Sequence, residues 1–157
     1  MKFSTKELVL QAMIASMYVV ITFLFQSVSF GAEQFRAAEF LLILVLVHPK
    51  NMVGIILGTL IANLFSTVGI VDVAVGTFAT YLALVLMTKL KGKWLKYLMP
   101  AVVNGVIIAI MLNVVFDLPL VITMFTVFGS ELIVTMVPWL IIGDKLIENP
   151  KIKEIFG

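Results

Sequence analysis

The sequence predicts an all-α integral membrane protein with six transmembrane helices and both termini on the cytoplasmic side. Three observations predict this fold: the hydrophobic content, the division of the chain into six apolar segments, and the distribution of the lysines. Of the 157 residues, 62% are hydrophobic and 13% are charged, and the mean hydropathy is +1.17. One soluble core cannot bury so much apolar surface, so lipid must cover most of it. We expect a single membrane domain over residues 1–157.

Polar breaks that can end a helix separate the six segments. SVSFGAEQ ends the first segment, HPKN the second, STVGIV the third, KLKGKWLK the fourth and FDLP the fifth. The first segment follows Lys2 and Lys6 and is longer than the apolar part of a usual signal peptide, so we expect a retained helix. The second and third segments are short for a crossing, which takes roughly 20 residues. The expected helices are residues 6–27, 35–48, 51–67, 72–90, 96–116 and 119–142.

The cations predict the orientation of these helices. If alternate breaks lie on opposite sides, all ten lysines fall on one side and Arg36, the only arginine, falls on the other. The positive-inside rule makes the lysine-rich side cytoplasmic. Trp94, Tyr97 and Trp139 would then lie at the inner membrane boundary, where amphipathic rings are favoured.

Acidic residues gather in the predicted outer half, where Glu33, Glu39, Asp72 and Asp117 lie at or near the surface. Glu131 lies about twelve residues from the outer end of the sixth segment, roughly 18 Å deep at about 1.5 Å per residue. A carboxylate at that depth costs about 2.5 to 3.5 kcal/mol on insertion scales, so it needs a partner, a proton or a cavity. We interpret Glu131 as a ligand-binding residue, and a hydrogen-bonded structural role is the alternative.

The other outer charges have structural alternatives as well. Asp72 and Asp117 precede predicted helices and can cap them, with Pro119 suited to the first helical position. Arg36 and Glu39 are spaced i and i+3 and can form a local ion pair at a helix start.

Amides and small residues lie within the apolar segments. Asn63, Asn104 and Asn113 can hydrogen-bond between helices, or contact a heterocycle with mixed donors and acceptors. Gly54, Gly58 and Ala62 form a stripe on the third segment that we expect to pack inside the bundle. Ala12 and Ser16 form a shorter stripe on the first segment that can dock a partner in the membrane.

Several kinds of chemistry are disfavoured by the residues present. The chain has no cysteine and one histidine, His48, so we expect neither a disulfide nor a metal site. No phosphate-binding loop, zinc-protease motif or nucleophile elbow occurs in the sequence. We expect no catalytic residues and no cofactor, and uphill transport would need ATP hydrolysis by another chain.

Three blocks cover most of the first four segments: QFRAAEFLLIL at 34–44, HPKNMVGIILGTLIANLFS at 48–66 and GIVDVAVGTFATYLA at 69–83. They resemble the QueT family of S components, the membrane-embedded substrate-binding subunits of energy-coupling-factor transporters. The family pattern reads F-R-x-[SA]-E, A-N-x-F-S and D-V-x-x-G-T in these blocks. Ala38 stands where serine is frequent, and the last two segments match mainly in hydropathy.

The resemblance implies an S-component-like bundle that binds a queuosine precursor, a 7-deazaguanine with a 7-aminomethyl or 7-cyano group, from outside a bacterial cell. It implies delivery to a separate transmembrane coupling protein and two ATPase subunits, with no nucleic-acid partner. A carboxylate can accept hydrogen bonds from the ring N–H and exocyclic amine, and a second carboxylate can pair with the aminomethyl cation. Arg36 would either neutralise Glu39 and hold the outer loop, to which Gly31 gives freedom, or donate to the ligand carbonyl.

The predicted site combines these polar anchors with aromatic rings that can stack on the ligand. The predicted binding residues are Glu131, Glu39, Asp72, Arg36, Asn63, Asn113 and Phe35, with Phe30 and Phe65 as further stacking candidates, and the partner-docking residues are Ala12 and Ser16. An S component for another vitamin or heterocycle is the first alternative. A proton-coupled carrier that uses Glu131 as its proton site is the second, and a structural protein or an intramembrane enzyme is less favoured.

Overall fold

The computed structural model describes residues 3–29 and 34–157, and every regular element within these ranges is a helix. Four helices are long and apolar enough to cross a membrane: α1 (Thr5–Leu24), α5 (Ile70–Lys89), α6 (Lys93–Phe116) and a continuous helix over Leu120–Glu148. The last consists of α7 (Leu120–Glu131), the π-helical turns η3 (Leu132–Met136) and η4 (Trp139–Gly143), and α8 (Asp144–Glu148). The chain is therefore an α-helical, multi-pass membrane protein, as predicted.

The predicted second and third helices are present as shorter elements. The second is a 3₁₀ helix, η1 (Ala37–Ile43), that continues into α3 (Leu44–Val47), and the third is α4 (Met52–Asn63). A 3₁₀ helix rises about 2.0 Å per residue against about 1.5 Å in an α-helix, so η1 extends farther than an α-helix of equal length. The count of six crossings and the orientation in the membrane stay predictions. The remaining elements are α2 (Gln26–Ser29), η2 (Pro49–Asn51) and α9 (Pro150–Phe156).

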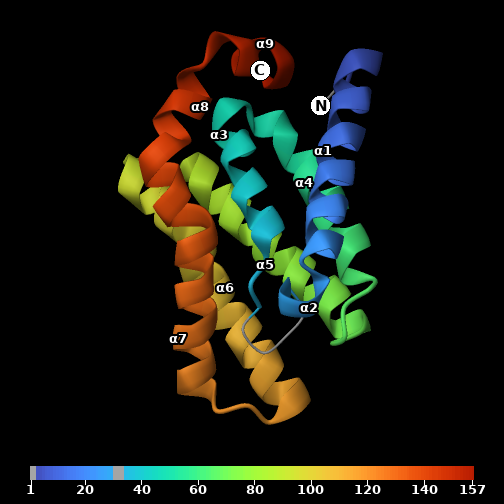
Figure 1. Ribbon diagram of the computed structural model, residues 1–157, viewed down its shortest axis with the longest axis vertical. Coiled ribbons are helices and arrows are strands. Elements are labelled where there is room, and N and C mark those ends of the chain that lie inside the picture. Colours follow the sequence, from blue (N-terminus) through green and yellow to red (C-terminus); the bar gives the residue numbers. More distant parts are fainter. Residues whose placement is uncertain (1–2, 30–33) are drawn as a thin grey trace.

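The segment η1–α3 lies in the middle of the bundle, with α1 and α4 on one side and the Leu120–Glu148 helix on the other (Figure 1). Leu42, Ile43 and Val45 are fully buried. Trp139 donates from its indole Nε1 to the Phe40 carbonyl oxygen at 3.0 Å, so it anchors the irregular backbone of η1. Trp139 is therefore buried inside the bundle and does not face lipid, and its depth relative to the membrane boundary stays a prediction.

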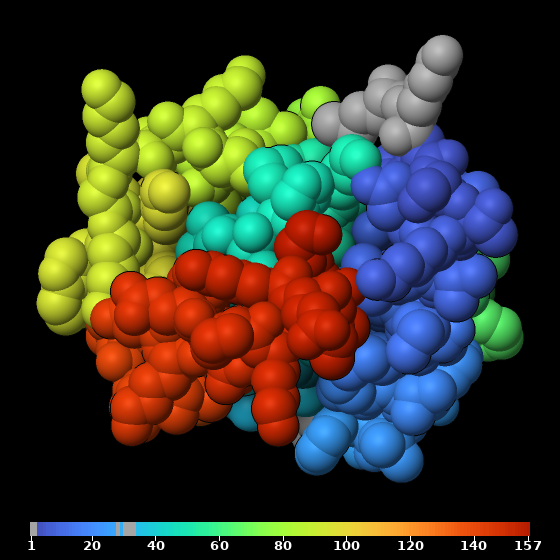
Figure 2. All heavy atoms as spheres, turned by 90° about the horizontal axis from the view of Figure 1, so that it is seen from above, coloured from blue at the N-terminus to red at the C-terminus, as the bar shows by residue number. Residues whose placement is uncertain are grey.

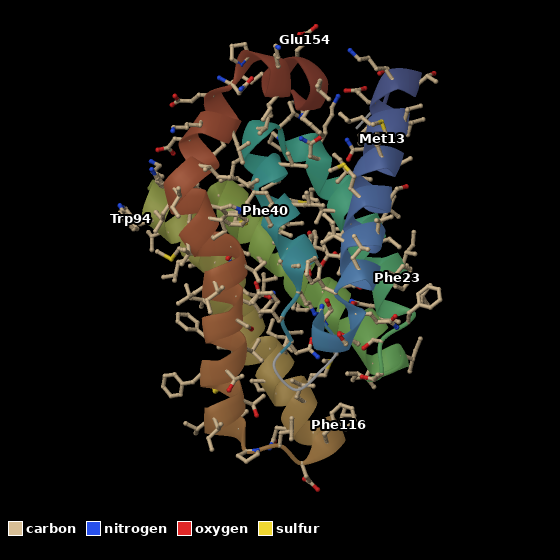
Figure 3. All side chains as sticks on the ribbon, viewed as in Figure 1. Met13, Phe23, Phe40, Trp94, Phe116 and Glu154 are labelled. Carbon is tan, nitrogen blue, oxygen red and sulfur yellow. The ribbon has the colours of Figure 1, made fainter. Side chains whose placement is uncertain are left out.

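Tyr97 is likewise enclosed by protein, while its hydroxyl reaches Asp144 at 3.4 Å, and its predicted place at the inner boundary stays a prediction. Its ring is buried and packs edge-on against Trp139, with the ring centroids 5.5 Å apart. Trp94 is exposed and points away from the bundle, as Phe23 and Phe116 do (Figure 3). Hydropathy cannot predict which of the two tryptophans is buried, because tertiary packing decides which indole donates a hydrogen bond to a buried carbonyl oxygen.

The small-residue stripe on α4 packs against α1, which confirms its predicted place inside the bundle. A Cβ atom added at Gly54 would lie 2.7 Å from the Gln11 carbonyl oxygen, and one at Gly58 would lie 2.6 Å from the Tyr18 Cβ. The absent side chains let the two helix backbones approach closely. This contact sets the position of Tyr18, which faces the interior.

The first turn of α1 and the C-terminal helix α9 lie at the same end of the bundle (Figure 1). Seen from above, the C-terminal residues (red) lie beside those of α1 (blue) and partly cover the central segment (cyan) (Figure 2). The buried Asn51 amide donates to the Phe156 carbonyl oxygen at 2.8 Å and to the Leu44 carbonyl oxygen at 2.9 Å. The arrangement agrees with two termini on one side.

The connection between α6 and α7 corrects the predicted role of Asp117. This residue is in the left-handed conformation, with φ of 56°, and it ends α6, while Pro119 occupies the position that precedes α7. Asn113 donates to the Leu118 carbonyl oxygen at 2.7 Å and so closes the same turn. Asp117 is exposed and caps no helix start, because the chain needs the left-handed residue to reverse direction.

Candidate ligand-binding site

A buried ion pair joins the start of η1 to the first turn of α5. The Arg36 Nη2 atom donates to both carboxylate oxygens of Asp72, at 2.8 and 2.9 Å, and the two side chains are 5% and 0% exposed. The predicted local pair of Arg36 with Glu39 is not what forms. Asp72 is also not the cap of its helix, since Gly69 occupies that position. A buried guanidinium needs a charged partner, and the fold supplies it from α5 rather than from the next turn.

Two residues near Asp72 hold this pair in place. The Asn63 amide donates to the Asp72 carbonyl oxygen at 3.1 Å and to the Thr77 hydroxyl at 3.3 Å, which ties the end of α4 to α5. Gly76, one turn after Asp72, leaves the space that the carboxylate occupies: a Cβ there would lie 3.2 Å from Asp72 Cγ and 2.9 Å from Asn63 Nδ2. Asn63, predicted to contact ligand, contacts protein here.

Glu39 is fully buried, and only one of its two carboxylate oxygens has hydrogen-bond partners among the described residues. Its Oε1 atom accepts hydrogen bonds from the Tyr18 hydroxyl of α1 at 2.6 Å and from the Thr80 hydroxyl of α5 at 3.2 Å. Its Oε2 atom is buried with no hydrogen-bond partner among the described residues. Helices on both sides therefore orient this carboxylate and leave one oxygen without a hydrogen bond.

Glu131 repeats the pattern on the neighbouring helix. The buried polar residues of these elements are called the cluster below: Gln34, Arg36, Glu39, Asp72, Asn104 and Glu131. It is 2% exposed, and its Oε1 atom accepts a hydrogen bond from the Asn104 amide of α6 at 2.8 Å. Glu131 Oε2 and Asn104 Oδ1 have no partner in the part of the chain that the structure describes. Glu39 lies in η1, which contacts η3, the element that begins directly after Glu131.

A π-helical turn begins immediately after Glu131. The Thr135 hydroxyl donates to the Glu131 carbonyl oxygen at 2.7 Å within this turn. Insertions of this kind widen a helix locally and often occur at functional sites. The π-helical turn and the Glu131 carboxylate, which has one oxygen without a hydrogen bond, thus lie next to each other on the same helix.

Gln34 is the residue of the cluster that sequence reasoning missed most clearly. It is 1% exposed, its Oε1 atom accepts from Arg36 Nε at 2.9 Å, and its Nε2 atom has no described partner. Asn104 was recognised only as one of several amides in apolar segments. The sequence signal that could have identified them is a polar side chain at the start of an apolar segment, for Gln34, and within one, for Asn104.

The remaining predicted residues lie apart from the cluster or outside the described ranges. Phe35 is half-buried beside it, and Asn113 is engaged in the α6–α7 turn. Phe65 is exposed and packs edge-on against Phe23, so it does not stack over the cluster. Phe30, Gly31 and Glu33 lie outside the described residues. Ala12 and Ser16 are exposed on α1, beside a groove of about 510 Å³ between α1 and α4.

Four buried polar atoms thus lack partners among the described residues: Gln34 Nε2, Glu39 Oε2, Asn104 Oδ1 and Glu131 Oε2. An unsatisfied buried polar group costs about 1 to 3 kcal/mol, so each of these atoms needs a further partner. Three of the atoms are acceptors and one is an amide donor. No group of three or more metal-ligating side chains occurs in residues 3–29 and 34–157. The chemistry of the cluster therefore suits a polar organic ligand rich in donors.

The family model described as QueT transporter matches residues 8–146. No curated protein and no solved structure matches the chain.

Proposed function

Since this chain belongs to the QueT transporter family, we propose that it is the substrate-binding S component of an ATP-driven importer of the energy-coupling-factor type. Family membership implies a transporter rather than an enzyme, and the long apolar helices agree with a multi-pass membrane protein. The proposed ligand is a queuosine precursor, 7-aminomethyl- or 7-cyano-7-deazaguanine. The observation that carries the proposal is the buried cluster of four unpaired polar atoms.

The chemistry of the cluster supports a 7-deazaguanine. The ring N–H and the exocyclic amine are adjacent donors, which two acceptors or one carboxylate can bind. A third acceptor can meet the aminomethyl group when it is present. Glu39 Oε2, Glu131 Oε2 and Asn104 Oδ1 offer these acceptors, and the proposal does not assign which carboxylate meets which end of the ligand.

The energy for uptake comes, in this proposal, from other subunits in the bacterial cell membrane. The sequence has no phosphate-binding loop, so a separate transmembrane coupling protein and two ATPase subunits would drive transport. Ala12 and Ser16 lie exposed beside the groove between α1 and α4, which gives a close-packing surface for a helical partner. These two residues are the proposed docking contacts.

A ligand-binding panel tests this proposal directly. Purified protein in detergent would be titrated calorimetrically with both 7-deazaguanines, riboflavin and thiamin. Binding of either 7-deazaguanine alone supports the proposal. Binding of riboflavin or thiamin instead would replace the substrate and keep the S-component role.

A proton-coupled carrier is the second candidate, and the half-satisfied, deeply buried Glu131 favours it. Uptake into cells at constant ATP distinguishes the two. Uptake that collapses when an uncoupler is added indicates the carrier, and uptake that persists indicates an ATP-driven importer.

A further inference from the structure

Gln34 is held in an unusual backbone conformation directly before η1. Its φ is 49°, in the left-handed region that residues other than glycine seldom adopt. The Arg36 backbone N–H donates to the Gln34 carbonyl oxygen at 2.9 Å, which closes the local turn. The side chain is thereby turned into the protein, where it is 1% exposed.

The Arg36 guanidinium determines which end of the Gln34 amide is free. A guanidinium has only donors, so the amide atom that faces Arg36 Nε at 2.9 Å must be the oxygen. The nitrogen must then point the other way, where it has no partner among the described residues. Asp72 holds the same guanidinium through both carboxylate oxygens, so the guanidinium itself has one orientation.

Gln34 Nε2 is the single donor among the four unpaired buried atoms of the described residues, and the other three are acceptors. When both carboxyl groups are ionised, Glu39 Oε2, Asn104 Oδ1 and Glu131 Oε2 bind only the donors of a ligand. The ring of the proposed 7-deazaguanine also carries a carbonyl oxygen, which needs a donor when it is buried. Gln34 Nε2 is the unpaired donor that the described cluster provides for it.

We propose that Gln34 is a specificity-determining residue that donates from Nε2 to the ring carbonyl oxygen of the bound 7-deazaguanine. Arg36 and Asp72 are positioning residues that keep the Gln34 oxygen turned away from the ligand. This inference rests on the proposed function, because it assigns one atom of the proposed ligand to one atom of the site. In this proposal Arg36 affects ligand binding by fixing the orientation of the Gln34 amide, not by contacting the ligand.

The test compares 7-aminomethyl-7-deazaguanine with its 6-thio analogue, in which sulfur replaces the carbonyl oxygen and both ring donors are retained. Sulfur is a weaker acceptor, so the wild-type protein should bind the oxo ligand roughly three- to tenfold more tightly, the range expected for one neutral hydrogen bond. Gln34→Met keeps the length of the side chain and removes the donor, and should bring the oxo-to-thio affinity ratio close to one. Gln34→Glu turns the donor into an acceptor and should weaken oxo binding further.

The matched control is Gln26→Glu, the same substitution at an exposed glutamine of α2, which should leave affinity and the ratio unchanged. Arg36→Lys should lower the ratio, because an ammonium does not fix the amide as the planar guanidinium does. An unchanged ratio in Gln34→Met would overturn the inference while the proposed function stands. Equal binding of both ligands by the wild-type protein would also overturn it, without any variant. If neither ligand binds and 7-cyano-7-deazaguanine does not bind either, the proposed substrate itself is overturned.

Discussion

Gly76 offers the sharpest test of how the ion pair is built, because it lies one helical turn after Asp72. A Cβ at this position would approach Asp72 Oδ1 well under 3.0 Å and would lie 2.9 Å from Asn63 Nδ2. The Asp72 carboxylate cannot rotate away without leaving Arg36, which it meets at 2.8 and 2.9 Å. Gly76→Ala therefore separates a buried charged pair, which costs about 3 to 5 kcal/mol.

Part of that loss is offset, because alanine favours a helix interior over glycine by about 1 kcal/mol. We expect the free energy of unfolding to fall by about 2 to 4 kcal/mol. A denaturant titration in mixed micelles, followed by tryptophan fluorescence, measures it. The control is Gly129→Ala in α7, where an added Cβ meets nothing within 4 Å and stability should hold or rise slightly. Equal stability of the two variants would refute the reasoning.

Three further predictions concern binding and transport. Glu131→Gln should lower ligand affinity about 10- to 100-fold, since hydrogen bonds to a charged group contribute about 1.5 to 3 kcal/mol, with little change in the free energy of unfolding. Calorimetric titration measures the affinity. The control Glu154→Gln, at an exposed position, should change neither the affinity nor the stability. Tyr18→Phe removes a donor 2.6 Å from a site carboxylate and should weaken binding roughly three- to tenfold, whereas Tyr81→Phe, at an exposed tyrosine, should not. Ala12→Leu should reduce ATP-driven uptake into proteoliposomes while ligand binding stays normal, and unimpaired uptake would contradict the docking role.

The sequence was sufficient to select most of the charged residues that meet in the cluster. Arg36, Glu39, Asp72 and Glu131 stand out because a charge within an apolar chain needs a reason. Their pairing was not predictable, because spacing along a helix reports only local neighbours. Arg36 lies three residues from Glu39, yet its partner is Asp72 on another helix.

Two amides show the limit of the same reasoning. Gln34 and Asn104 look unremarkable in the sequence, since polar side chains also occur in loops and between helices. Their importance appears only when their hydrogen bonds are traced, because one half of each amide is bound and the other half is free. Asn63 and Asn113 had the same appearance in the sequence and are engaged by the protein instead.

Hydropathy and the breaks alone determined that this is a helical membrane protein and approximately where each helix lies, because the free energy of placing side chains in lipid is nearly additive along the chain. The 3₁₀ form of η1, the π-helical turn after Glu131 and the partners of the buried charges were decided by tertiary structure. These features depend on which helices touch, and that depends on close contacts such as Gly58 against Tyr18. Local sequence selects the residues that can bind, and packing decides which of their atoms are left free to do so.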